Sequence, residues 1–210
     1  MVRSGSIMAL CLAVLGRWSG NARAPAVAIG NLLGGFAMLA LCWRLARGSA
    51  APAMPSLRAG AGLGVALLLL QVALGGLLSE SYAAMSCGGL VECIAASAGV
   101  PWSALDPWRE PVLALTAPVN PSGALAQTVH RLSSLAVLLV VLPLGIAASC
   151  KGRRRHGVLL LTLLAAELAL GLRMTGGVSL ALALAHNVIA ALLLATAFDL
   201  MRGSGTAWSQ

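Results

Sequence analysis

The feature that most constrains this chain is a set of long apolar segments. They cover residues 25–46, 59–79, 124–149, 157–175 and 178–201. Each has about the 20 residues that a helix needs to cross the hydrocarbon core of a bilayer. Backbone polar groups find no partner in hydrocarbon, so a segment that crosses it folds as a helix. The sequence therefore predicts an all-α integral membrane protein with five full spans.

The overall composition agrees with this fold class. The 210 residues are 59% hydrophobic and only 10% charged, and their mean hydropathy is +0.91. A soluble domain of this size does not need so much apolar surface. The net charge of +8 does not indicate nucleic-acid binding, because the basic residues lie mostly between the apolar segments and only 4% of residues are aromatic. We expect the lipid bilayer as a partner, and no nucleic acid.

The basic residues also predict the orientation of the spans. They flank the loop at 48–58, fill the turn from Lys151 to Arg155 and begin the tail at 202–210. The positive-inside rule places these segments in the cytoplasm. The polar segment 80–122, which holds four of the six acidic residues, is then on the outer side. We expect the inner membrane of a bacterium, where this segment faces an oxidising compartment.

The first residues of the chain have two interpretations. A basic start and the apolar run from Ile7 to Gly16 resemble a signal peptide, with Ala22-Arg23-Ala24 as its cleavage site. The alternative is a short membrane helix at residues 6–17. We favour the helix, because this part of the chain resembles a later helix pair.

That internal repeat predicts how the spans are grouped. Leu15-Gly16 matches Leu170-Gly171 at an offset of 155 residues, and at the same offset Asn31 aligns with His186. A duplicated four-helix bundle without its first two helices has this pattern. The predicted parts are a partial N-terminal bundle at 1–47 (short helix 6–17 and span 25–46), a cytoplasmic loop at 48–58, a C-terminal four-helix bundle at 59–201 with the outer loop 80–122, and a tail at 202–210.

Two of the three histidines lie inside predicted spans. An ionisable residue is costly there and indicates a functional site. At about 1.5 Å per residue, His130 and His186 lie roughly 9 and 12 Å along helices that both enter from the outer side. Similar depth on parallel helices favours two axial ligands of one heme. The alternative is that each histidine hydrogen-bonds to a helix carbonyl. A tetrahedral zinc site is disfavoured, because no third or fourth ligand lies at that depth.

Three motifs connect the chain with a known family. The first is Gln71-Val72-Ala73-Leu74-Gly75-Gly76 with Ser81-Tyr82-Ala83-Ala84 and the following Cys87 and Cys93. The other two are Gln127-Thr128-Val129-His130-Arg131-Leu132 and Ala185-His186. In these motifs the chain resembles the heme A synthase family, whose members are membrane enzymes built from two similar four-helix bundles. The resemblance implies an oxidoreductase that converts the C8 methyl group of heme O, its substrate, to the formyl group of heme A for cytochrome oxidase assembly. It also implies that His130 and His186 ligate the iron of a heme b in the C-terminal bundle.

The chain also departs from the family pattern. The first two helices of the N-terminal bundle are missing, and Asn31 stands where the family typically has a histidine. We therefore assign no catalytic residue. One alternative function is a heme-binding electron carrier or assembly subunit, and another is a membrane scaffold or transporter subunit without heme. The expected partners are a supplier of heme O and cytochrome oxidase assembly factors, with a second copy of the chain as a further candidate.

Several polar residues predicted at the outer side have both a functional and a purely structural interpretation. Arg131 follows His130, so its guanidinium can pair with a heme propionate, or it can simply anchor the helix at the interface. Arg109 is a weaker candidate for the same role. Cys87 and Cys93 are expected to form a disulfide in an oxidising compartment. Free thiols, or exchange with a thioredoxin-like partner, are the alternatives.

Two further ionisable residues lie near the membrane. Glu167 is in the middle of a predicted span, where a charged acid costs about 2.5–3.5 kcal/mol. We expect it to be protonated or bonded to a neighbouring helix. The spacing from Gln71 to Gly75 repeats that from Glu167 to Gly171. His156 lies in the basic turn, where we expect it to be in water.

Overall fold

The computed structural model describes residues 24–47, 54–113, 119–175 and 177–201, together with six positions between Ile7 and Val14. Those six positions are helical. They fall in the stretch where the sequence predicts a short helix, and the rest of that stretch lies outside the described residues. Residues 48–53 of the predicted loop and the tail at 202–210 also lie outside them.

Five helices are long and apolar enough to cross a membrane. They are α2 (Pro25–Arg47), α3 (Pro55–Glu80), α5 (Ala124–Cys150), α6 (Arg154–Met174) and α7 (Leu180–Met201). No strand occurs among the residues that the structure describes. The prediction of an all-α integral membrane protein is therefore confirmed. The helix ends differ from the predicted ones by no more than four residues, the largest difference being the earlier start of α3 at Pro55.

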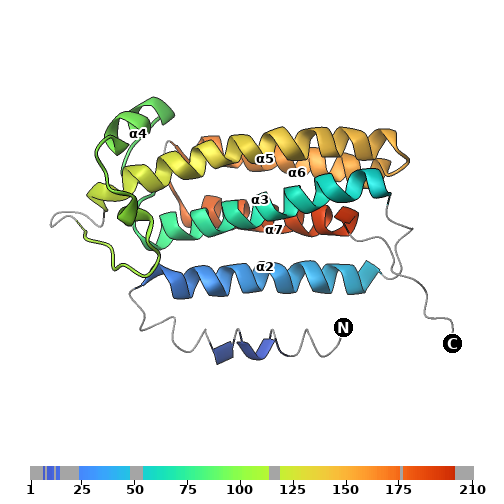
Figure 1. The fold of residues 1–210 in the computed structure, drawn as a ribbon, viewed down its shortest axis with the longest axis horizontal. Helices are drawn as coiled ribbons and strands as arrows, with labels where there is room; N and C mark the ends of the chain where they lie inside the picture. Colours follow the sequence, from blue (N-terminus) through green and yellow to red (C-terminus); the bar gives the residue numbers. More distant parts are fainter. Residues whose placement is uncertain are drawn as a thin grey trace.

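Four of these helices form a bundle, and the fifth lies alongside it. α3 and α6 each pack against both α5 and α7, so α5 and α7 stand at opposite corners of the bundle. α2 packs against α3 and α7 (Figure 1). All five helices contribute to one apolar core, which includes Phe36, Leu68, Val141, Leu160 and Leu193.

Glycines let α5 and α6 approach each other closely. A Cβ atom at Gly157 would lie 2.6 Å from the backbone nitrogen of Ser149 and would also meet the carbonyl oxygen of Gly145. A Cβ atom at Gly145 would lie 2.8 Å from Cδ2 of Leu161. Membrane helices associate through small residues of this kind, because lipid tails provide no hydrophobic driving force between helices. The sequence of this helix pair therefore specifies backbone contact.

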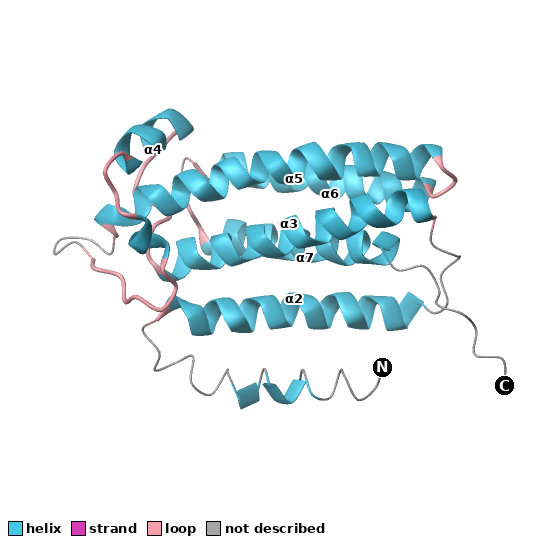
Figure 2. Cartoon of the chain, in the orientation of Figure 1, coloured by secondary structure: helices cyan, strands magenta, loops and turns pink. Residues whose placement is uncertain are grey.

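The segment between α3 and α5 folds over one end of the bundle. It contains α4 (Leu90–Ser97) and the short 3-10 helices η1 (Trp102–Leu105) and η2 (Pro121–Gly123). α4 and η1 both pack against α5. Figure 2 shows this segment at the opposite end of the bundle from the turn between α5 and α6. The polar segment is thus a folded cover at one end of the spans.

A buried carboxylate joins three helices at the other end. Asp199 of α7 lies 3.8 Å from Arg44 of α2 and 3.9 Å from His156 of α6. The side chain of Asp199 is 4% exposed and that of His156 is 17% exposed. The prediction that His156 is in water is therefore wrong. His156 follows exposed basic residues in sequence, but it lies in the first turn of α6, which packs against α7.

Candidate functional site

Two histidines lie at equal depth on opposite corners of the bundle. His130 is the seventh residue of α5, and His186 is the seventh residue of α7. At about 1.5 Å per residue, each lies roughly 9 Å from the start of its helix. Both helices start at the end that carries α4 (Figure 1). The structure thus places the two histidines that the sequence singled out at the same level of the bundle.

His130 is surrounded by polar groups from α3 and from its own helix. The amide nitrogen of Gln71 lies 3.3 Å from each ring nitrogen of His130 and donates a hydrogen bond of 3.1 Å to the His130 carbonyl oxygen. The hydroxyl of Ser133 contacts the amide oxygen of Gln71 and lies 2.9 Å from the same carbonyl. A Cβ atom at Gly75 would lie 3.4 Å from Cε1 of His130. The absence of a side chain at Gly75 therefore leaves room for the ring.

His186 has an acidic neighbour on α6. Its Nδ1 atom lies 3.2 Å from Oε1 of Glu167, without the alignment of a complete hydrogen bond. The second carboxyl oxygen, Oε2, is buried and has no hydrogen-bond partner among the described residues. A Cβ atom at Gly171 would lie 3.8 Å from Cε1 of His186. The His186 ring therefore also lies beside a glycine of the neighbouring helix.

The two helix pairs repeat one arrangement. In α3 and α5, Gln71 and Gly75 flank His130, and in α6 and α7, Glu167 and Gly171 flank His186. The equal spacing of the flanking residues was visible in the sequence, but the histidine that each pair contacts was not. Among the described residues, no three His, Cys, Asp or Glu side chains form a metal-binding group.

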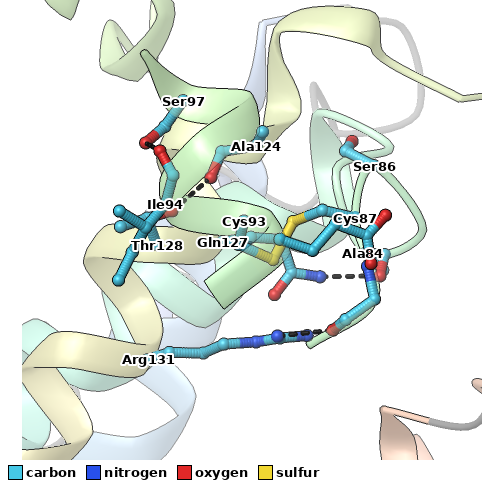
Figure 3. Close-up of a disulfide and its surroundings, with 12 residues drawn as sticks. Ala84, Ser86, Cys87, Cys93, Ile94, Ser97, Ala124, Gln127, Thr128 and Arg131 are labelled. Atoms are coloured by element: carbon cyan, nitrogen blue, oxygen red, sulfur yellow. Dashed lines mark hydrogen bonds between the residues drawn. A yellow bond between two sulfur atoms is a disulfide. The ribbon is translucent and has the colours of Figure 1, made fainter. Parts of the chain in front are cut away.

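The folded cover is attached to α5 within one turn of His130. Arg131 donates a hydrogen bond of 2.5 Å to the carbonyl of Gly88, and Gln127 donates one of 2.6 Å to the carbonyl of Ala84 (Figure 3). Cys87 and Cys93 are joined by a disulfide, and Cys93 is fully buried. These contacts fix the cover above the His130 end of the bundle. The pairing of Arg131 with a heme propionate stays a prediction.

One known protein family matches most of this chain. A family model for a cytochrome oxidase assembly protein, COX15-CtaA, matches residues 7–198. The chain belongs to the COX15-CtaA family. The match covers α2 to α6 completely and nearly all of α7, and it confirms the resemblance to heme A synthases that the motifs indicated. No curated protein and no solved structure was found to match the chain.

In this COX15-CtaA protein, the structure places three residues beside the histidines that the sequence did not assign to the site. Gln71 was part of a motif but had no expected contact with His130, and Ser133 was not considered. Glu167 was expected to be either protonated or bonded, and the structure places it beside His186. Arg109 lies outside the bundle, where its guanidinium donates a hydrogen bond of 3.3 Å to the hydroxyl of Ser103.

Proposed function

We propose that this chain binds heme b in the bundle of α3, α5, α6 and α7, with His130 and His186 as the two axial ligands. The observation that carries the proposal is the pair of histidines at equal depth on opposite corners of the bundle. A porphyrin fills four coordination positions of its iron, so two protein ligands on opposite sides complete the coordination. We further propose that residues 59–201 form the complete bundle and residues 1–47 a partial second one.

The side chains around the histidines fit such a group. Neutral imidazole nitrogen is a usual ligand of heme iron. Gly75 and Gly171 place no side chain of their own against the Cε1 atoms of the two rings. The Nδ1 atom of His186 is buried without a complete hydrogen bond, and buried polar groups of this kind call for a partner. These features support a site whose ligand orders the rings when it binds.

The reaction we propose is that of a heme A synthase. Conversion of the C8 methyl group of heme O to the formyl group of heme A, with water as the source of the oxygen atom, releases four electrons and four protons in total. The reaction therefore requires an external electron acceptor. Heme b would supply an electron-transfer centre within the membrane. The chain itself holds both ligands at one depth and covers that end of the bundle through Arg131 and Gln127. Membership of the cytochrome oxidase assembly family supports this reaction class.

We propose the inner membrane of a bacterium as the location, with segment 80–122 on the outer side. The disulfide between Cys87 and Cys93 lies in this segment, and disulfides persist in oxidising compartments. The basic turn from Lys151 to Arg155 lies at the opposite end (Figure 1), where the positive-inside rule expects the cytoplasm. The two arguments are independent and give the same orientation.

One observation favours a second function, that of a heme b electron carrier or assembly subunit. The chain has only three histidines, and the third, His156, lies at the other end beside Asp199. A separate substrate heme would therefore have no histidine pair of its own within this chain.

Co-expression separates the two functions. The chain is produced with an enzyme that supplies heme O, in a host without its own heme A synthase, and the membrane hemes are extracted and separated. Heme A in these membranes, and none with a His130→Ala variant, supports the synthase. Bound heme b with unconverted heme O contradicts the synthase and supports the electron carrier. Purified protein without heme contradicts both and leaves a heme-free scaffold.

A further inference from the structure

The neighbours of the two histidines have opposite hydrogen-bonding character. Glu167 presents a carboxyl oxygen 3.2 Å from Nδ1 of His186. Gln71 presents an amide nitrogen, which can only donate, 3.3 Å from both ring nitrogens of His130. The amide oxygen of Gln71 is occupied by the hydroxyl of Ser133. The amide cannot turn this oxygen toward His130 without losing that contact.

This difference matters for metal ligation. A histidine that binds a metal through one ring nitrogen carries a proton on the other, and this proton needs an acceptor. A carboxylate acceptor fixes the tautomer and the ring orientation, and it makes the imidazole a stronger electron donor. The carboxylate of Glu167 can accept a hydrogen bond from Nδ1–H of His186, which leaves Nε2 for iron. The nitrogen of Gln71 is equally distant from both nitrogens of His130 and selects neither.

From this geometry we infer that Glu167 is a positioning residue for His186 and makes His186 the stronger of the two axial ligands. The inference rests on the proposed bis-histidine heme. Nδ1 of His186 and Oε2 of Glu167 are both buried without a hydrogen-bond partner in the described part of the chain. A small rotation of the imidazole aligns its N–H with the carboxylate and removes the cost of leaving Nδ1 unpaired. Glu167 thereby has a role in a span where an acid is otherwise unfavourable.

The inference predicts a specific effect on the heme potential. A ligand that donates more strongly stabilises ferric over ferrous iron, so the carboxylate lowers the midpoint potential. The Glu167→Gln variant keeps the shape of the side chain but removes the strong acceptor. We expect this variant to keep a low-spin heme and to shift the midpoint potential upward. A tenfold change in the ferric-to-ferrous ratio corresponds to about 59 mV for one electron.

The experiment compares three purified proteins in one detergent. Wild type, Glu167→Gln and the matched control Thr196→Val, which removes a buried hydrogen bond to the Leu192 carbonyl elsewhere on α7, are assayed for heme per chain and then titrated spectroelectrochemically. We expect about a tenfold change in the ferric-to-ferrous ratio for Glu167→Gln and less than a twofold change for Thr196→Val. Equal shifts in the two variants, or an unchanged potential in Glu167→Gln, would overturn the inference while leaving the heme site intact. Wild type without heme would instead contradict the proposed function itself.

A second measurement tests the inference if the Glu167→Gln variant does not fold or does not bind heme. Heme retention is compared between His130→Ala, which keeps the Glu167–His186 pair, and His186→Ala, which keeps only His130. We expect several-fold more heme in His130→Ala, as a five-coordinate species. Equal retention, or more heme in His186→Ala, would contradict the assignment of His186 as the stronger ligand.

Discussion

At the scale of single residues, each histidine of the candidate site packs against a glycine one helix away. Gly75 of α3 faces His130, and Gly171 of α6 faces His186. A glycine in a helix costs about 1 kcal/mol relative to alanine. This cost is understandable if the space that Gly75 and Gly171 leave beside the two rings is needed to admit a large ligand.

A larger side chain at Gly75 is predicted to reduce heme binding. The Cβ atom of Gly75→Val would lie 3.4 Å from Cε1 of His130, and the branched methyl groups would push the ring from its position. Overpacking costs about 1–3 kcal/mol, and about 1.4 kcal/mol is a tenfold change in affinity. Heme titration of purified protein should show affinity reduced by about tenfold. Gly35→Val is the control, because a Cβ atom there meets nothing within 4 Å. The same loss in both variants would refute the steric explanation.

The residue pairs were harder to predict from the sequence than the residues themselves. His130 and His186 stand out because an ionisable side chain in a span needs an explanation. The partner of each depends on helix rotation and on which helices are neighbours, and periodicity in an apolar segment does not give either. For this reason the sequence left open whether Glu167 is protonated or bonded to a neighbouring helix. The packing of α6 against α7 places it beside His186. His156 was placed wrongly for the same reason.

At the scale of helices, α5 and α6 approach each other closely enough for backbone contact at two glycines. Gly145 and Gly157 face each other, and Ser149 lies beside them. Because α6 carries Glu167 and α5 carries His130, this contact also sets the distance between the two halves of the candidate site. The existence of both helices followed from their apolar length, whereas their close approach required the structure.

Alanine at Gly157 is predicted to separate this helix pair. The new Cβ atom would lie 2.6 Å from the backbone nitrogen of Ser149, so the backbones must shift. We expect a net loss of about 1–3 kcal/mol of stability, despite the better helix propensity of alanine. Thermal unfolding in detergent should show a lower midpoint for Gly157→Ala. Gly62→Ala, whose Cβ atom would lie 3.7 Å from a flexible Met201 sulfur, should leave the midpoint unchanged or raise it. The opposite order would argue against glycine-mediated contact.

At the scale of the whole molecule, the two ends of the bundle differ in chemistry. One end carries the Cys87–Cys93 disulfide and the folded cover. The other end carries the basic turn and Asp199 with its neighbours Arg44 and His156. The candidate site lies nearer the covered end. This polarity gives the protein a defined orientation in the proposed account and places the histidines in the outer half of the membrane.

Thiol labelling tests that orientation. The free cysteines at positions 11, 42 and 150 are replaced by alanine, and single cysteines are introduced by Ser103→Cys or Lys151→Cys at exposed sites. A membrane-impermeant maleimide applied to intact spheroplasts should label the Ser103→Cys protein at once. It should label the Lys151→Cys protein only after lysis. The reverse pattern would show that the basic turn is outside and would overturn the proposed topology.

His130 and His186 are proposed to ligate one heme together. The most direct measurement is the reduced-minus-oxidised spectrum of purified wild type, His130→Ala and His186→Ala at matched protein concentrations. We expect a low-spin b-type spectrum in wild type that is lost in both variants, because each removes one of the two proposed ligands. A low-spin spectrum that persists in either variant, or wild type without any heme spectrum, would contradict the claim.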